Sequence, residues 1–222
     1  MEHTYKEALI QCPLFEGMSQ EEIIFELGSL PYRIIQYARN DIYSLCGDDC
    51  RTVDIVTSGE MVVRMIGMSG RQVEILRLRT GDIIAPCFIF SSDRQLPAEI
   101  EATENTQLLR ISPKTLEQLI DKSSHIRHNF IRTLSDIGAY LASKIGFLAL
   151  KTVREKVVYL LRSEAIAQHS LKLTLSQSRQ CIADCFAIQK FSLMRCLAEL
   201  VEEGIIAVNG KEITILDAHR LK

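Results

Sequence analysis

Residues 182–195 carry side chains suited to the chemistry of nucleic-acid recognition. The segment reads IADCFAIQKFSLMR, and its second half holds Gln189, Lys190, Ser192 and Arg195. Amide and guanidinium groups can hydrogen-bond base edges, and basic or hydroxyl groups can bind phosphates. Apolar residues recur at helical spacing in the same segment. The pattern therefore predicts a helix with one buried face and one polar face that could meet the major groove of DNA.

Neighbouring segments predict the structure that would position this helix. Two short helices are expected at residues 176–186 and 189–203, with Ala187 at the turn between them, where the left-handed conformation favours glycine. A longer helix is expected before them at residues 152–167. After them, two apolar runs flank Asn209-Gly210, which favours a hairpin with a type I′ turn. This order is typical of a winged helix-turn-helix.

Residues 31–112 have a different pattern, in which β-branched and aliphatic residues alternate with polar ones. Short strands at regular intervals are typical of a sandwich or barrel, so we predict an antiparallel β jelly roll. Two helices should precede it, one at residues 4–10 and one that begins at Ser19. The Ser19 hydroxyl can cap the amide of Glu22, and the Glu22 carboxylate can cap the start of the helix in return. The turn signals, at intervals of 12, 11 and 11 residues, are Gly47-Asp48, Gly59-Glu60, Ser69-Gly70 and Gly81-Asp82.

Apolar residues after position 125 repeat at close to the 3.5-residue period of a coiled-coil seam. We predict one long helix at residues 122–149 that pairs with the same helix of a second copy, giving a homodimer. The apolar stripe could instead pack only on the barrel. Its members are Ile126, Phe130, Leu134, Ile137, Leu141, Ile145 and Leu148.

The whole chain is expected to be an α+β protein of three parts. The predicted boundaries are 1–121 for the barrel with its N-terminal helices, 122–149 for the dimerisation helix and 150–222 for the winged helix-turn-helix. Hydrophobic residues make up 47% of the 222 residues, which supports a proper core. There is no stretch of about 18 uninterrupted apolar residues and no signal-peptide pattern. We therefore expect a soluble, cytoplasmic protein that does not bind membranes.

Charge is distributed unevenly along the chain, whose formal net charge is −2. Residues 151–222 hold 11 basic and 8 acidic side chains, a balance of +3, whereas the remainder has a balance of −5. The C-terminal third is therefore the part that could approach a polyanion. The seven cysteines are an odd number spread through apolar segments, which favours reduced thiols.

Catalytic and metal-binding patterns are not found in the sequence. No Ser/His/Asp set, carboxylate pair or Gly-rich phosphate motif stands out, so we expect no enzyme and no catalytic residues. His125 and His128 share a face at the start of the long helix. They lack two further nearby ligands, so we predict no metal site there.

Short motifs follow one another along the chain in a distinctive order. They are Cys12-Pro13-Leu14-Phe15-Glu16-Gly17-Met18-Ser19 at the start, Gly47-Asp48 and Ser58-Gly59-Glu60 in the barrel, Gly81-Asp82 before the segment expected to hold a ligand, and Gly204-Ile205-Ile206 with Gly210-Lys211 at the wing. Because the motifs follow in this order and at this spacing, nearly all of the chain resembles the CRP/FNR superfamily of bacterial transcription regulators. The resemblance implies a cyclic-nucleotide-binding-like barrel, a long dimer helix and a C-terminal DNA-binding domain.

The resemblance also implies which residues contact DNA. Lys190 and Arg195 match basic positions of the family, whereas Phe191 does not match, so the target sequence cannot be carried over from a relative. Phe191 could contact a thymine methyl group or tuck back toward the protein. The residues expected at the DNA are Ser178, Arg179, Gln189, Lys190, Phe191, Ser192, Arg195 and Lys211, with Ser178 and Arg179 near the phosphates.

Two signals used within the family are not expected here. Nucleotide-binding members carry Gly-Glu after the Gly-Asp turn and Arg-Ser or Arg-Thr about ten residues later, which hold the ribose and the cyclic phosphate. The matching positions are Ala85-Pro86 and Leu96-Pro97. They would leave a buried phosphate without an arginine partner, which argues against cyclic AMP. Iron-sulfur members need several cysteines near the N-terminus, and this N-terminus offers only Cys12.

An apolar segment at residues 83–90 suits an apolar ligand or haem instead. The stretch IAPCFIF followed by Leu96-Pro97 also resembles the branch of nitrosative-stress regulators, some of which bind haem. The predicted effector pocket consists of Ala85, Pro86, Cys87, Phe88, Phe90, Leu96, Phe130 and Leu134.

These patterns together predict an effector- or redox-responsive regulator of transcription. A signal would pass from the barrel through the dimer helix to the recognition helix. The expected partners are duplex DNA with a palindromic operator, a second copy of the chain, an unidentified small-molecule effector and RNA polymerase. A second hypothesis is a small-molecule sensor whose degenerate helix-turn-helix binds a partner protein instead of DNA.

Overall fold

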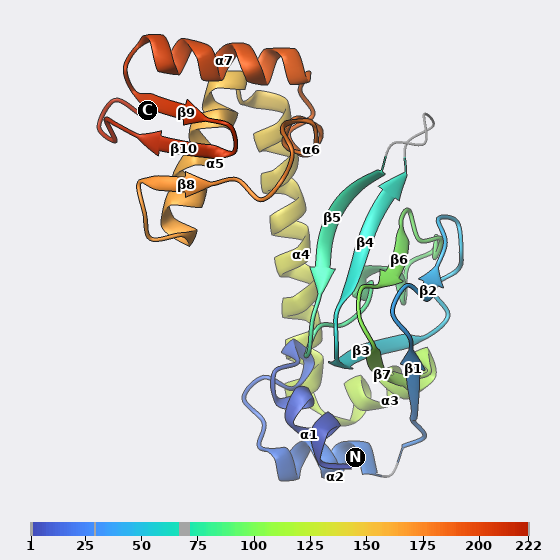
Figure 1. Ribbon diagram of the computed structural model, residues 1–222. Coiled ribbons are helices and arrows are strands. Elements are labelled where there is room, and N and C mark those ends of the chain that lie inside the picture. The colour runs from blue at the N-terminus through green and yellow to red at the C-terminus, as the bar shows by residue number, and fades with distance from the viewer. Residues whose placement is uncertain (1, 29, 67–71, 222) are drawn as a thin grey trace. The chain divides into compact units, whose positions relative to one another are not determined.

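The computed structural model describes residues 2–28, 30–66 and 72–221. The segment at residues 31–112, in which apolar and polar residues alternate, folds into antiparallel strands, as predicted. One sheet has the strand order β1-β7-β3 and the other the order β2-β6-β4-β5, and both can be followed in Figure 1. The predicted turn at Ser69-Gly70 lies outside the described residues. The strands are β1 (Arg33–Tyr37), β2 (Ile42–Ser44), β3 (Val53–Ser58), β4 (Met61–Ile66), β5 (Gln72–Leu78), β6 (Glu99–Ala102) and β7 (Thr106–Ile111).

Glycine turns connect the strands at the predicted positions. Gly47, Gly59 and Gly81 have φ values of 94°, 85° and 94°, a backbone region that favours glycine. At Gly59 a β-carbon would also lie 2.5 Å from the Thr106 hydroxyl oxygen and 2.6 Å from the Asn105 carbonyl oxygen. The β3–β4 turn therefore requires glycine for both backbone conformation and space.

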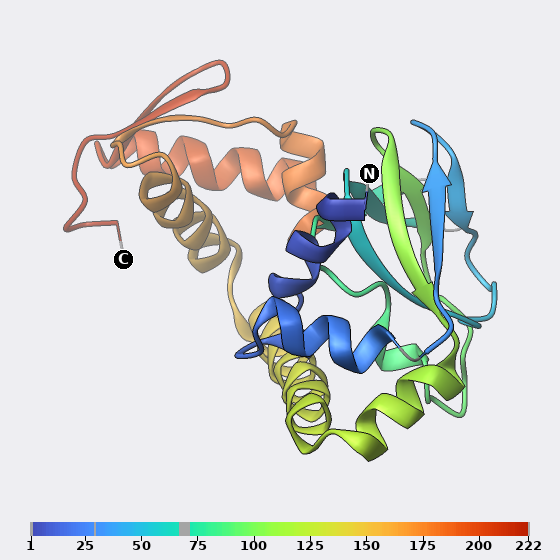
Figure 2. The same ribbon diagram turned by 90° about the horizontal axis from the view of Figure 1, so that it is seen from below.

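Helices α1, α2, α3 and the first half of α4 complete the core of the roll. Ser19 and Glu22 form the predicted capping pair at the start of α2, because each side chain accepts a hydrogen bond from the backbone amide of the other. Figure 2 shows the blue α1 and α2 beside the roll and the first half of α4. The bounds are α1 (Glu2–Ile10), a 3-10 turn (Pro13–Phe15), α2 (Gln20–Gly28), a second 3-10 turn (Pro86–Phe88), α3 (Pro113–Lys122) and α4 (Ser124–Leu150).

A buried ion pair joins strands that are far apart in sequence. Asp54 on β3 is fully buried, and its carboxylate accepts hydrogen bonds from Arg110 on β7 at 2.7 and 3.1 Å. The hydroxyls of Tyr43 and Thr52 donate to the same carboxylate at 2.6 and 2.7 Å. Four donors of this kind compensate the desolvation of the buried charge.

The apolar stripe of α4 divides into two parts with different environments. Ile126 and Phe130 are buried in the core of the roll, and Leu134 packs against that core. Leu141 and Ile145 are 50% and 66% exposed. The first part therefore packs on the barrel, while the second part leaves apolar surface uncovered in the single chain.

The chain divides into two compact units, Met1–Ala139 and Tyr140–Lys222, and the boundary falls within α4. The C-terminal unit has its own core, to which Leu161, Ala183, Leu193 and Ile213 contribute. Its three-stranded sheet has the order β8-β10-β9. The elements are α5 (Val153–Ala167), β8 (Lys172–Thr174), α6 (Arg179–Cys185), α7 (Lys190–Glu202), β9 (Ile206–Asn209) and β10 (Glu212–Ile215).

The predicted turn type of the hairpin is wrong. Asn209 pairs with Glu212, so the two residues of the loop are Gly210 and Lys211 rather than Asn209 and Gly210. Gly210 has a φ of 57°, and Lys211 is not among the described residues with positive φ. A type I′ turn needs positive φ at both central residues, whereas glycine first and an ordinary residue second is the type II′ pattern.

Lys156 on α5 is a buried cation that ties together three helices of the C-terminal unit. The residue is 5% exposed. Its ammonium donates to the carbonyl of Leu148 near the end of α4 at 2.8 Å, and to the carbonyl of Phe186 at the end of α6 at 3.1 Å. Carbonyls at helix ends lack partners within the helix and carry partial negative charge, so they suit a buried ammonium.

The remaining sequence expectations concern the thiols and the membrane. No disulfide joins any of the seven cysteines, all of which lie within the described residues. Among the described helices, none combines the length and the apolarity needed to cross a membrane.

Candidate nucleic-acid interface

Helix α7 places its apolar residues inward and its predicted DNA-reading residues outward. Leu193, Cys196 and Leu197 are 1%, 3% and 4% exposed in the core of the C-terminal unit. Lys190 is exposed, and the side chain of Arg195 is 66% exposed. One side of α7 is therefore anchored, and its basic groups are accessible to a partner.

The turn before α7 holds the start of the helix in place. Ala187 has a φ of 52°, so it adopts the left-handed conformation for which glycine is the usual residue. The amide of Ile188 donates to the carbonyl of Ala183 at 2.9 Å, which closes the turn onto α6. Gln189 is the N-cap of α7, and its side chain makes no capping hydrogen bond in the described structure. Its exposed amide can therefore meet another molecule.

Four of the predicted residues line one cleft of about 420 Å³, formed by the start of α6, the start of α7 and the hairpin. They are Ser178, Arg179, Lys190 and Lys211. The Ser178 hydroxyl accepts from the amide of Cys181 at 3.1 Å and so caps α6. The cleft combines hydroxyl and basic groups, which is the chemistry that binds a phosphate backbone.

Arg179 is oriented by the wing. Its guanidinium donates to the Gly210 carbonyl at 3.1 Å, and partial burial lowers the pKa of this group from its ordinary value. Arg195 lies outside the cleft, and its nearest acidic partner is Glu199 at 3.6 Å. A single exposed pair of this length restrains a side chain weakly, so Arg195 can turn to a phosphate or a base.

The predicted set and the observed cleft differ in membership. Gln189, Phe191, Ser192 and Arg195 do not line the cleft, although Gln189, Phe191 and Arg195 are exposed and Ser192 is partly so. Gln177, Gln180, Met194 and Gly210 line it and were not predicted. Met194 follows Phe191 by three residues, so helical periodicity could have placed it on the same face.

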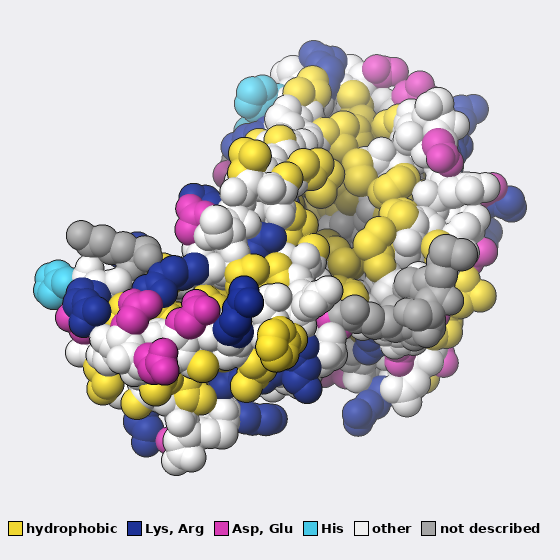
Figure 3. Space-filling view, turned by 90° about the horizontal axis from the view of Figure 1, so that it is seen from above, with side chains coloured by type: hydrophobic (Ala, Val, Ile, Leu, Met, Phe, Trp, Pro, Cys, Tyr) yellow, Lys and Arg dark blue, Asp and Glu magenta, His cyan; other side chains and the backbone are white. Residues whose placement is uncertain are grey.

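The predicted effector residues lie around the core of the N-terminal unit. Phe90 contacts Phe130 edge to face, with ring centroids 5.9 Å apart. Ala85, Phe88 and Leu134 pack against the same core. Figure 3 shows hydrophobic side chains gathered in a hollow on one face of this unit.

The other predicted effector residues have separate surroundings. Cys87 is exposed and Pro86 is buried. Leu96 is 4% exposed, and it lines a polar cavity of about 420 Å³ together with Tyr43 and Arg110. The aromatic residues Phe90 and Phe130 of the predicted pocket are therefore in contact with each other, whereas Leu96 lines a different cavity.

The positions that would hold a cyclic phosphate do not suit that group. Ala85 has a φ of 49° and begins a 3-10 turn, Pro86 follows it into the interior, and Leu96 is part of the apolar core. These side chains offer no cation and no hydrogen-bond donor to a phosphate. The residues therefore do not fit a cyclic nucleotide held in that way.

Within residues 2–28, 30–66 and 72–221, no three or more His, Cys, Asp or Glu side chains are grouped so that they could hold a metal ion. Burial raises the pKa of the Cys12 thiol to about 12, which disfavours the thiolate that a metal would need.

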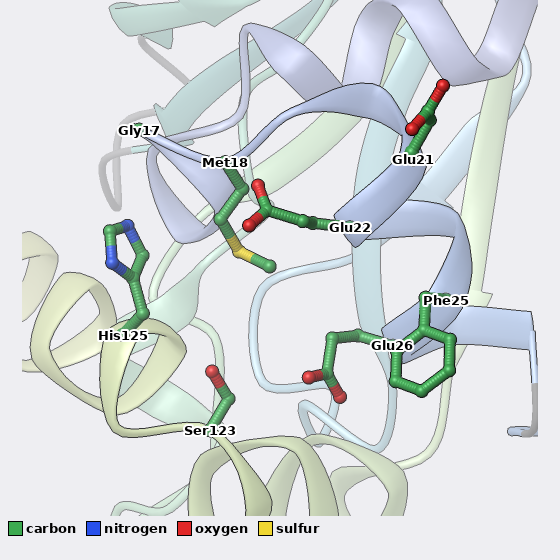
Figure 4. A pocket seen from close by; sticks show the side chains of 8 residues that line it. All are labelled: Gly17, Met18, Glu21, Glu22, Phe25, Glu26, Ser123 and His125. Carbon is green, nitrogen blue, oxygen red and sulfur yellow. The ribbon is translucent and has the colours of Figure 1, made fainter.

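A cavity of about 510 Å³ in the N-terminal unit was not predicted from the sequence. Figure 4 shows Met18, Glu22 and Glu26 on one side of it and Ser123 and His125 on the other. His125 Nε2 lies 2.6 Å from the carbonyl oxygen of Glu16, and a β-carbon at Gly17 would come within 3.2 Å of the same nitrogen. His125 thus packs against the segment before α2.

Comparisons with known proteins match both units to known domains. Residues 34–123 match the family model of the cyclic nucleotide-binding domain, and residues 155–222 match the Crp-like helix-turn-helix domain. The two matches follow in the predicted order, the barrel domain before the helix-turn-helix domain, and α4 lies between them.

Curated relatives and a solved structure agree with these matches. The chain is 22% identical over 187 residues to the cAMP-activated global transcriptional regulator Vfr of Pseudomonas aeruginosa, covering 81% of this chain and 87% of Vfr. It is 26% identical over 202 residues to the transcriptional activator protein FnrL of Cereibacter sphaeroides, covering 86% and 78%.

The fold is also that of the c-di-GMP responsive global regulator CLP of Xanthomonas campestris. The TM-score is 0.65 at 19% identity, with 88% of this chain and 98% of CLP covered. These relatives belong to a family of dimeric DNA-binding regulators rather than enzymes. With both domains matched in order, the chain belongs to the CRP/FNR superfamily of transcription regulators.

Proposed function

We propose that this regulator acts as a homodimer that binds a palindromic operator through α7 and responds to an apolar effector held by the N-terminal unit. The observation that carries the DNA-binding part is the outward face of α7. Lys190 and Arg195 are exposed on a helix whose opposite face is anchored by Leu193 and Leu197. Such an arrangement suits insertion into the major groove.

Dimerisation is supported by the second half of the α4 stripe. Leu141 and Ile145 expose apolar surface at a spacing that continues the buried half of the same stripe. A second copy of α4 would cover both side chains. In such a dimer, two α7 helices would meet successive major grooves about 34 Å apart, and a shift of the α4 pair would change that spacing.

The effector is proposed to be an apolar molecule, for which haem is one candidate. Phe90, Phe130 and Leu134 provide an apolar surface. Support for haem comes from this apolar surface and not from a histidine that could bind the iron. His125 is not directed to the surface, because its Nε2 lies 2.6 Å from the Glu16 carbonyl oxygen. An absorption spectrum of the protein supplied with haem tests the candidate, and the absence of a Soret band would remove it.

A thiol-based signal at the buried residues Cys12 and Cys50 has less support than an effector. Burial raises the pKa of the thiols of Cys12 and Cys50. A raised pKa lowers the fraction of reactive thiolate at neutral pH. RNA polymerase is a further proposed partner, by analogy with relatives that are named transcriptional activators.

The experiment that tests the DNA-binding proposal compares wild-type protein with Arg195→Ala on a duplex selected from a random pool. We expect a loss of at least tenfold in affinity, because a charge-assisted contact is lost from each protomer. Lys172→Ala is the matched control. Its charge lies on β8 with a side chain that is 66% exposed, paired with Glu212 at 3.3 Å. Equal affinities of Arg195→Ala and wild-type protein would refute the proposal.

A second candidate function is binding of a partner protein through α7. Phe191 is 73% exposed, and exposed aromatic side chains often anchor protein interfaces. Under this alternative, no duplex would be enriched from the random pool. Arg195→Ala would then leave partner binding unchanged.

A further inference from the structure

The first two turns of α7 carry an apolar strip in the middle of the polar outer face of this helix. Phe191 is 73% exposed, and Met194, three residues later on the same face, is 45% exposed. Lys190 and Arg195 flank this strip in sequence and are exposed as well. The phenyl ring therefore points away from the core and does not tuck back toward the protein.

An exposed phenyl ring in this position recognises a limited set of groups. It has no hydrogen-bond donor or acceptor, so it cannot pair with the polar edges of guanine, adenine or cytosine. In the major groove the apolar group that a base pair presents is the C5-methyl of thymine. A ring held against any other base would cover polar edges without replacing their hydrogen bonds to water.

The surrounding residues can fix where the ring falls. Ser178, Arg179 and Lys211 lie with Lys190 around one cleft beside the start of α7. Contacts from such groups to phosphates set the register of a helix in the groove but carry little sequence information. Specificity at the centre of the interface then depends on the side chains at the start of α7.

We infer that Phe191, supported by Met194, reads a thymine methyl group, so that each half-site of the operator carries thymine beneath the first turn of α7. The inference rests on the proposed DNA-binding function and adds the base that is recognised. The contact would bury one methyl group per half-site. At about 0.8 kcal/mol per buried carbon, removal of that methyl lowers affinity about fourfold per half-site and about 15-fold for both.

The test uses the full-length dimer and a duplex selected from a random pool. Each symmetric pair of thymines, one in each half-site, is replaced in turn by deoxyuridine, which removes only the methyl groups. We expect one symmetric pair of positions at which wild-type affinity falls about 15-fold. The Phe191→Ala variant should bind more weakly and should not distinguish thymine from uracil there. Cytosine placed at the same position should weaken wild-type binding, and 5-methylcytosine should restore part of the affinity.

Val201→Ala is the matched control, because Val201 is an apolar residue near the other end of α7 with a comparable exposure of 43%. It should keep the full response to the methyl group. The inference is overturned if wild-type protein tolerates uracil at every thymine, or if Phe191→Ala keeps the same response. If no duplex is enriched from the pool, the DNA-binding proposal itself fails, so the two failures are distinct.

Discussion

Replacing Lys156 with methionine should destabilise the C-terminal unit. Lys156 is 5% exposed, and methionine would fill the same space with a long apolar side chain. The substitution would remove the ammonium group. The carbonyls of Leu148 and Phe186 would then lose donors that lie at 2.8 and 3.1 Å. The change isolates the polar contacts of a side chain that links the end of α4 to the turn before α7.

The size of the effect follows from the two orphaned carbonyls. A buried group without a partner costs about 1–3 kcal/mol, so two would cost about 2–6 kcal/mol. The site around Leu148 is only partly buried, and removal of the charge recovers part of its desolvation cost. We therefore expect a loss of about 2–3 kcal/mol. In a unit of this size, that loss lowers the melting temperature by about 10–20 °C.

The measurement is calorimetric unfolding of the full-length protein, with hydrogen exchange to locate the change in the C-terminal unit. Lys172→Met makes the same chemical change at an exposed ion pair in the same unit and should shift stability by less than about 1 kcal/mol. A Lys156→Met protein as stable as wild-type protein would refute the reasoning. It would mean that burying the ammonium costs as much as its hydrogen bonds return.

Three further predictions concern the turn, a helix cap and the dimer. Ala187→Gly should stabilise the C-terminal unit by about 0.5–1 kcal/mol in urea unfolding, because glycine relieves the left-handed strain at φ 52°; a destabilised variant would contradict this. Hydrogen bonds from Lys151 and from the amide and hydroxyl of Thr152 lower the Glu155 pKa from 4.5 to about 2. The ionised Glu155 side chain should therefore stabilise the protein fully above about pH 5, and this stabilisation should be lost on acidification toward pH 2. Melting temperatures of Glu155→Gln and wild-type protein should thus converge at low pH, and a constant difference would count against the cap. Ile145→Asp, at a residue that is 66% exposed in the single chain, should give a monomer in sedimentation experiments, whereas an unchanged dimer would exclude the α4 seam.

Local signals explain why much of the fold could be predicted from the sequence. The capping pair of Ser19 and Glu22 depends on residues three apart, and both hydrogen bonds are present. The turns at Gly47, Gly59 and Gly81 depend on a conformation that glycine favours, and all three have positive φ. Such features are set by near neighbours, which a single sequence displays directly.

Features set by distant residues could not be predicted in this way. The Asp54–Arg110 pair joins residues 56 apart, and nothing near either residue indicates its partner. The three-residue strand β8 is too short to show alternation, and it exists because it pairs with β10. The seven-position stripe of α4 gave no sign that Ile126 would be buried while Ile145 stays exposed, because periodicity does not show what covers a face.

The candidate nucleic-acid interface also combines features that near neighbours determine with features that depend on distant residues. The outward position of Lys190 and Arg195 could be predicted from helical spacing. The cleft that joins Lys190 to Arg179 and Lys211 depends on how the hairpin folds back onto α6, which involves the contact of Arg179 with the Gly210 carbonyl. That contact links residues 31 apart, so local spacing does not show that Arg179 and Lys211 share a cleft with Lys190. Met194, by contrast, could have been placed on this face by helical periodicity.

The salt dependence of duplex DNA binding by the full-length protein tests most directly whether α7 recognises DNA. Four basic side chains per protomer belong to the candidate interface: Arg179, Lys190 and Lys211 line the cleft, and Arg195 is exposed on α7. If half to all of them meet phosphates in a dimer, the slope of log affinity against log salt should be about −4 to −7. Affinity should then fall by at least a hundredfold between about 50 and 200 mM salt. A slope near zero over that range would contradict recognition of DNA by α7.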